Sequence, residues 1–314
     1  MDSFAANAPE SKDEAPLRRV ESHFNGHAGI PLVYRSWVPR TPVRSLAIVH
    51  GFGEHSGRYE HVATWFSRRG TAVYSFDLRG HGRSAGKRGH VESFADYLND
   101  LDFFLGRVER ESGSLPITLL GHSMGGLITT AYAVERNPSV QSLITSGAAL
   151  ALSSELSGFK ITLARLFNKI APRLSMNAGL DASAISSESE EVKRYVEDPL
   201  VHGLSTASHA AGLIDQIERV RGRGAEVKIP MFVTHGALDR LCPPAGSMAF
   251  YQSLPGTIPG SSAPHAAFRM YERSCHEILN DVEREQVMAD MLDWIECREK
   301  DVTALRNEET LNDG

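Results

Sequence analysis

The chain has 314 residues, of which 41% are hydrophobic and 23% are charged, and its formal net charge at pH 7 is -6. Such a chain can bury the core of one large α/β domain. The net negative charge and the dispersed lysines and arginines give no general attraction to nucleic acid, so we exclude nucleic acid as an expected partner.

Cysteine usage and the N-terminal segment indicate the compartment. Cys242, Cys275 and Cys297 are too few and too irregularly spaced for a disulfide framework or a zinc site. Residues 1–17 have neither the apolar core of a signal peptide nor the arginines of a transit peptide. No apolar run approaches the roughly 20 residues that span a bilayer. We therefore expect a cytoplasmic protein whose membrane contact, if it exists, is peripheral.

Short apolar runs alternate with helical patterns along most of the chain. The turn signal at 25–29 predicts an antiparallel hairpin, and the later alternation predicts a mostly parallel sheet with helices on both faces. The predicted strands are 19–24, 32–38, 45–50, 72–76, 117–120, 142–145, 229–234 and 268–271, and the predicted helices are 59–69, 94–111, 124–136, 245–254 and 281–299.

The alternation breaks between Ser146 and Lys228, where helical patterns occur without a convincing strand. We interpret this interruption as a helical cap inserted into the α/β domain. The predicted division is a disordered tail at 1–17, an α/β core at 18–149 and 221–300, a cap at 150–220 and a polar tail at 301–314.

One helical pattern of the cap combines apolar positions with a basic row. Arg165, Lys169 and Arg173 recur at helical spacing, and residues 158–174 contain no acidic side chain. Such a helix either packs over a binding site or docks on an anionic lipid surface. The cap is therefore where we expect peripheral membrane contact. It could also join two copies, so a monomer and a homodimer both remain open.

The predicted strand before the motif Gly121-His122-Ser123-Met124-Gly125 leads directly into it. Glycines two residues before and after a serine leave room for a strained strand-to-helix turn, which exposes the hydroxyl. Because a serine hydroxyl is a poor nucleophile at neutral pH, it needs a base and a group that orients the base. Ser123 is the predicted nucleophile.

The partners of such a serine follow it in the order Asp or Glu, then His. Asp239 lies just after the predicted strand 229–234, and His276 just after 268–271. Because carboxyl ends of parallel strands meet at one edge of the sheet, both residues should lie near Ser123. We predict that His276 is the general base and that Asp239 orients it.

Other candidates are less well placed. His265 precedes its strand and would emerge at the opposite edge, and Asp281 is expected to start the last helix beside the capping residue Asn280. His122 and His235 flank the motifs, and we expect structural roles for both.

An ester carbonyl under attack develops negative charge on its oxygen, which two backbone N–H groups must receive. One donor is the residue after the nucleophile, Met124. We expect the second to be Phe52 in the loop His50-Gly51-Phe52-Gly53, where the flanking glycines let the backbone approach substrate.

Several blocks of the chain resemble the monoacylglycerol lipases of the α/β-hydrolase superfamily. They are residues 50–59, 77–84 with 86–89, 121–126, 192–195 and 198–202. The resemblance implies the α/β-hydrolase fold. It also implies the triad and the oxyanion donors named above.

In that family, the positions of Glu54, Arg58 and Tyr195 line the pocket or exit for the glycerol portion of the substrate. A salt bridge and a tyrosine that packs against the cap are the structural alternatives for these residues. We expect Asp77 and Arg79 to brace a turn near the site.

These observations predict a serine esterase that cleaves monoacylglycerols, or a similar single-chain lipid ester, without a metal or organic cofactor. A lysophospholipase or broad carboxylesterase is the alternative within hydrolases, because the triad is indifferent to the alcohol that leaves. A ligand sensor or a lipid-binding protein on the same fold is the alternative from another class.

Overall fold

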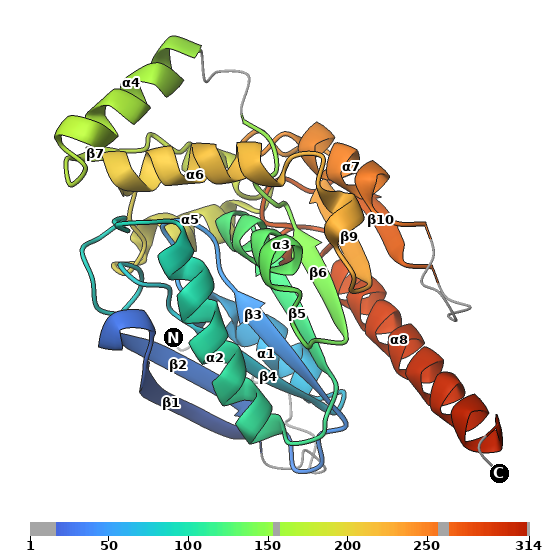
Figure 1. Cartoon of the computed structure of the whole chain (residues 1–314). Coiled ribbons are helices and arrows are strands. Elements are labelled where there is room, and N and C mark those ends of the chain that lie inside the picture. The colour runs from blue at the N-terminus through green and yellow to red at the C-terminus, as the bar shows by residue number, and fades with distance from the viewer. Residues whose placement is uncertain (1–16, 153–157, 257–263, 313–314) are drawn as a thin grey trace, which may run out of the picture.

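A computed structural model describes residues 17–152, 158–256 and 264–312. At its centre is an eight-stranded sheet in the order β1-β2-β4-β3-β5-β6-β9-β10 (Figure 1). β2 is antiparallel to both of its neighbours, and all other adjacent strands are parallel. The strands are β1 (Arg18–Asn25), β2 (Pro31–Val38), β3 (Arg44–Val49), β4 (Thr71–Phe76), β5 (Ile117–His122), β6 (Ser142–Ser146), β9 (Met231–Gly236) and β10 (Ala266–Tyr271). The predicted hairpin and the mostly parallel sheet are confirmed.

The inner strands are continuous apolar runs because both faces of the sheet are covered. Every residue of β3, β4, β5, β6 and β9 is buried, whereas no residue of the edge strand β1 is buried. One hydrophobic core joins the sheet to Phe66 of α1 and Met291 of α8. A second core joins it to Phe104 of α2, Leu127 of α3 and Phe250 of α7.

These five helices confirm the predicted coverage of both faces. They are α1 (Glu60–Ser67), α2 (Ala95–Ser112), α3 (Met124–Arg136), α7 (Pro244–Ser253) and α8 (Arg284–Asn312). Short 3₁₀ turns are η1 (His27–Gly29), η2 (Ser56–Tyr59), η3 (Ala182–Ala184), η4 (Gly224–Glu226) and η5 (Ile278–Asn280).

The segment predicted as a helical cap, residues 150–220, is called the cap segment below, and it contains strands that were not predicted. It contains α4 (Gly158–Ile170), α5 (Ser189–Glu197) and α6 (Ala207–Val220), but also the short antiparallel pair β7 (Ser175–Asn177) and β8 (Leu204–Thr206). The expectation that this region has no strand is therefore wrong. Three-residue strands are too short to leave a periodic signal, and their pairing depends on segments distant in the sequence. In Figure 1, α6 crosses above α3 and α4 lies outermost.

The beginning and end of the last helix also differ from prediction. α8 begins at Arg284, and the expected N-cap Asn280 belongs to η5. The Asp281 carboxylate instead accepts hydrogen bonds from the Ser187 hydroxyl and the Cys275 backbone. Asp281 follows η5 as its C-cap residue and lies outside the helix. α8 continues to Asn312, past its predicted end at Glu299. In the described part of the chain, no helix is both long and apolar enough to cross a membrane.

Candidate active site

Ser123 occupies a strained turn between β5 and α3. Its backbone angles are φ 53° and ψ -117°, and it is one of three non-glycine residues with positive φ in the described part of the chain. The turn needs the glycine at 125, because a Cβ there would lie 2.2 Å from the Val49 carbonyl oxygen. A side chain held in such a conformation is typical of functional sites. The hydroxyl is thereby presented at the carboxyl edge of the sheet.

His276 and Asp239 are in direct contact at the same edge. The His276 Nδ1 atom lies 2.7 Å from Asp239 Oδ2, and the Asp239 side chain has no exposed surface. The other oxygen, Oδ1, accepts the backbone N–H groups of Leu241 and Cys242 at 2.8 and 2.9 Å. The carboxylate is therefore fixed by hydrogen bonds on both oxygens.

This environment separates the proton affinities of the pair. Burial opposes ionisation of Asp239, but the charge of His276 and hydrogen bonds from His235 and His276 lower the pKa of Asp239 well below its usual range. Burial also opposes protonation of His276, yet the Asp239 carboxylate raises the pKa of His276 overall. The imidazole can therefore take up a proton beside a carboxylate that stays ionised.

Two neighbouring histidines differ in their relation to the pair. The Nε2 atom of His235 lies 2.9 Å from Asp239 Oδ2, so this buried residue supports the carboxylate. His122 lines the same cavity as Ser123, and its ring centroid lies 4.8 Å from that of His276. Burial lowers the pKa of His122 to about 3, so the ring is neutral at neutral pH.

The loop that carries His276 is held by the cap segment. The backbone N–H of Glu277 donates to the Ile185 carbonyl at 2.7 Å, and that of His276 to Ala184 at 3.4 Å. The carboxylate of Asp281, which follows this loop, also accepts a hydrogen bond from the Ser187 hydroxyl of the cap. The position of His276 therefore depends on the cap as well as on β10.

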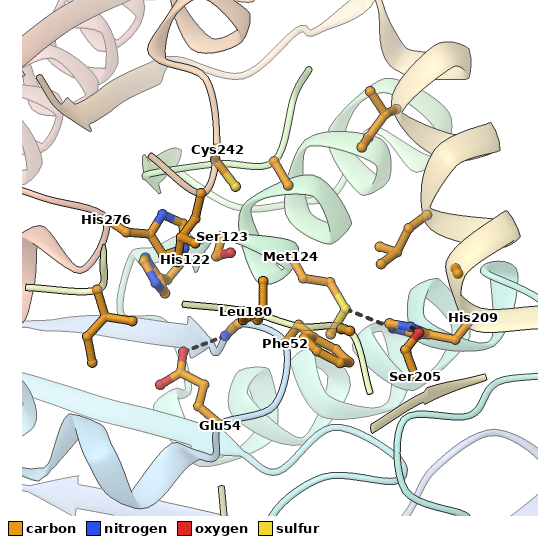
Figure 2. Close-up of a pocket in the computed structure, with 18 of the residues that line it drawn as sticks. Phe52, Glu54, His122, Ser123, Met124, Leu180, Ser205, His209, Cys242 and His276 are labelled. Atoms are coloured by element: carbon orange, nitrogen blue, oxygen red, sulfur yellow. Dashed lines mark hydrogen bonds between the residues drawn. The ribbon is translucent and has the colours of Figure 1, made fainter. Parts of the chain in front are cut away.

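Phe52 and Met124 both line the cavity beside Ser123 (Figure 2). Met124 is the first residue of α3, where backbone N–H groups have no acceptor within the helix. The Gly51 N–H is already bound to Glu54 Oε1 at 2.6 Å, which fixes the loop before Phe52. After Phe52, the Gly53 carbonyl accepts the N–H of His202 from the cap at 2.8 Å. The loop is thus tied down on both sides of Phe52.

The cavity around Ser123 has a volume of about 290 Å³ and a mostly apolar wall. Its apolar side chains include Leu152, Leu180, Leu213, Ile214, Ile217 and Leu241. Its polar side chains include His276, Glu54, Glu277 and Tyr195. The cavity therefore offers a long apolar surface and a small polar region.

Arg58 lies behind this polar region and binds two carboxylates. Its guanidinium contacts Glu277 at 2.6 and 2.7 Å and Glu54 at 2.9 Å, and it lies over the Tyr195 ring. Burial raises the pKa of Glu54. Burial also opposes ionisation of Glu277, but the charge and hydrogen bonds of Arg58 outweigh it and lower the pKa of Glu277. Glu54 and Tyr195 line the cavity, whereas Arg58 forms the buried bridge foreseen as its structural alternative.

Sequence reasoning missed Glu277, whereas it expected for His235 the structural role that this residue has in supporting Asp239. Glu277 directly follows a predicted triad member, and that proximity was the available signal. Asp77 and Arg79 brace neighbouring loops, as predicted. The buried Asp77 carboxylate accepts hydrogen bonds from the backbone N–H groups of Ser56 and Arg83. The Arg79 guanidinium donates two hydrogen bonds to the Asp100 carboxylate.

Comparison with known proteins identifies the family. The family model for serine aminopeptidases, S33, matches residues 40–283. A monoacylglycerol lipase of Mycolicibacterium smegmatis is 35% identical over 279 residues, which cover 88% of this chain and 97% of that protein. The chain belongs to the monoacylglycerol lipase family. The monoglyceride lipase of Homo sapiens is 30% identical over 86% of this chain and 92% of its own length.

A solved structure agrees with the family assignment. The crystal structure of the Paleococcus ferrophilus monoacylglycerol lipase superposes with a TM-score of 0.76 at 32% identity, over 85% of this chain and 99% of that one. The α/β-hydrolase fold predicted from the sequence blocks is confirmed.

Proposed function

We propose that this protein hydrolyses the ester bond of monoacylglycerols to a free fatty acid and glycerol. The observation that carries the proposal is His276, which is hydrogen-bonded to the buried Asp239 and lines the same mostly apolar cavity as Ser123 on its strained turn. Membership in the monoacylglycerol lipase family supports an ester as the substrate.

The reaction proceeds through an acyl-enzyme. His276 takes the proton of Ser123 as the hydroxyl oxygen attacks the ester carbonyl. The backbone N–H groups of Phe52 and Met124 receive the negative charge that develops on the carbonyl oxygen. His276 then gives the proton to the departing glycerol oxygen. Water, activated by the same imidazole, releases the fatty acid and restores Ser123.

The cavity fits the two ends of a monoacylglycerol. One acyl chain can lie along the apolar wall that α6 contributes through Leu213, Ile214 and Ile217. The glycerol hydroxyls can hydrogen-bond with Glu54 and Tyr195 near the reacting serine. Burial of the acyl chain supplies binding energy, and the polar groups orient the glycerol of the substrate.

The charge of the polar region favours glycerol over a phosphate-bearing head. Glu54 and Glu277 both line the cavity, and the single Arg58 guanidinium between them carries one positive charge. An anionic phosphate next to these carboxylates would be repelled. A lysophospholipid is therefore a poorer substrate than a monoacylglycerol.

A substrate panel tests this proposal. Purified wild type and Ser123→Ala are compared on a monoacylglycerol, a diacylglycerol, a lysophosphatidylcholine and a simple ester. We expect the monoacylglycerol to react fastest, and S123A to lose about six orders of magnitude in turnover. Near wild-type turnover by S123A would overturn the serine mechanism, and a preference for lysophosphatidylcholine would overturn the substrate.

The outer helix of the cap supports a second part of the proposal, peripheral membrane contact by a cytoplasmic enzyme. Leu166 and Ile170 of α4 are 50% and 68% exposed, and Lys169 lies on the same helix. Arg165 instead binds Asp215 and Glu218 of α6. Apolar side chains with a nearby cation are typical of interfacial helices.

Vesicle sedimentation tests this contact. We expect the wild type to bind anionic vesicles more than neutral ones, and Ile170→Glu to reduce binding while turnover of a water-soluble ester stays unchanged. Equal sedimentation of wild type and I170E would contradict a role for α4.

A further inference from the structure

His209 contacts the side chains of both residues proposed as oxyanion donors. Its ring stacks on the Phe52 ring, with centroids 5.1 Å apart and planes inclined by 26°. Its Nε2 atom lies 3.3 Å from the Met124 sulfur. Figure 2 shows His209 at the end of the cavity remote from His276, with Met124 and Phe52 between His209 and Ser123.

His209 is itself held in place. It lies in the first turn of α6, is 1% exposed, and its backbone N–H donates to the Thr206 hydroxyl. Its Nδ1 atom lies 2.8 Å from the Ser205 hydroxyl. Because a thioether has no hydrogen to donate, the contact with Met124 requires the proton on Nε2. In the neutral ring, Nδ1 then accepts from Ser205. Both ring nitrogens thus have defined partners.

The Phe52 side chain connects His209 to the loop 50–53, whose backbone carries one of the proposed oxyanion donors. The residues on both sides of Phe52 are glycines, and Gly53 adopts φ +77°. Glycines give the peptide groups around Phe52 conformational freedom. The hydrogen bonds of Gly51 and Gly53 hold the loop on either side, and the Phe52 ring gives it a further point of attachment. The rings of His81 and His202 approach Phe52 edge-on, at 5.8 and 5.9 Å, whereas His209 alone among these three stacks on it.

We propose that His209 is a positioning residue that orients the oxyanion hole through Phe52 and Met124. The proposal rests on the function proposed above, in which these two backbones receive the oxyanion. His209 belongs to α6 of the cap. The position of α6 and the alignment of the oxyanion donors are therefore coupled. A displaced α6 would leave Phe52 without its stacking partner, and the enzyme would bind ester without stabilising the transition state well.

Three variants separate positioning from contact with the acyl chain. His209→Ala removes the stack and the polar contacts, and His209→Phe keeps a ring against Phe52. Leu213→Ala is the matched control, because Leu213 lies one turn further along α6 and lines the same cavity. Each is assayed on p-nitrophenyl acetate and on a long-chain p-nitrophenyl ester, and its reaction rate with a fluorophosphonate is measured.

We expect H209A to lower kcat about tenfold to hundredfold on both esters, because a small misplacement of oxyanion donors acts on the transition state. KM should change little, and fluorophosphonate labelling should slow in parallel. H209F should recover most of kcat. L213A should change KM for the long ester alone.

A wild-type kcat in H209A, or a loss confined to the long ester, would overturn the proposal. If circular dichroism shows that H209A does not fold, H209F is compared with His209→Gln on the short ester. The proposal requires H209F to retain the higher kcat. A higher kcat in H209Q overturns it. S123A serves in the same assays. Activity in S123A refutes the proposed function itself, whereas an inactive S123A beside an unaffected H209A refutes only the role of His209.

Discussion

Arg58 binds Glu277, the residue next to His276, through both of its carboxylate oxygens at 2.6 and 2.7 Å. The same guanidinium binds Glu54, which holds the Gly51 N–H. One buried cation therefore joins the loop before Phe52 to the loop of His276. Its removal would leave two buried carboxylates close together.

We expect Arg58→Met to lower the free energy of unfolding by about 3 to 5 kcal/mol, since an uncompensated buried charge is costly. Urea denaturation measures this. Arg165→Met is the control, because Arg165 also binds two carboxylates but at an exposed site, where ion pairs contribute little. Equal losses in the two variants would contradict the assigned role of Arg58.

Glu277→Gln should shift the acidic limb of the kcat/KM profile to lower pH. The Glu277 carboxylate is one of the charges that raise the pKa of His276. Without it, the imidazole loses its proton at lower pH, so the active neutral form persists further into acid. A pH–rate profile on a neutral ester measures the shift. A limb that stays in place or moves to higher pH would refute this electrostatic link.

Asp239→Asn should lower kcat by about four orders of magnitude. The amide lacks the charge that stabilises protonated His276 and can hold the ring in the wrong tautomer. Steady-state kinetics measures the loss, with Asp181→Asn as a surface control that keeps its activity, because Asp181 is exposed. A loss of less than tenfold in D239N would argue against Asp239 as the orienting residue.

The same carboxylate should make stability depend on pH. The pKa of Asp239 is lower in the folded protein than in the unfolded chain, so its contribution is present above about pH 4 and is lost as pH falls further. D239N lacks that contribution. The difference in unfolding free energy between wild type and D239N should therefore narrow below about pH 4. A difference that stays constant down to pH 3 would contradict the lowered pKa.

Gly125→Ala should destabilise the protein by more than about 2 kcal/mol and abolish turnover, because its Cβ would lie 2.2 Å from the Val49 carbonyl oxygen. Gly106→Ala is the matched control. Gly106 is also helical, and an added Cβ there meets only the end of Arg110 at 3.7 Å. Helix propensity predicts a gain of up to about 1 kcal/mol for this control. Thermal unfolding and ester hydrolysis measure both variants.

The sequence by itself determined the features that depend on local pattern. Apolar runs and turn residues specified the parallel sheet and its hairpin, and the ends of β9 and β10 placed Asp239 and His276 at one edge. The structure brings these two side chains into hydrogen-bond contact. The burial of each strand follows from the hydrophobic pattern of consecutive residues, so it can be predicted without knowledge of the fold.

Only the tertiary structure decided which distant side chains meet. The Arg58–Glu277 bridge joins residues 219 positions apart, and the contact of His209 with Met124 spans 85. The pairing of β7 with β8 has the same origin. Such contacts arise when packed elements bring their side chains within a few ångströms, and no periodicity along the chain encodes that meeting. The parts of the site that position the predicted triad and oxyanion donors therefore emerge from packing between core and cap.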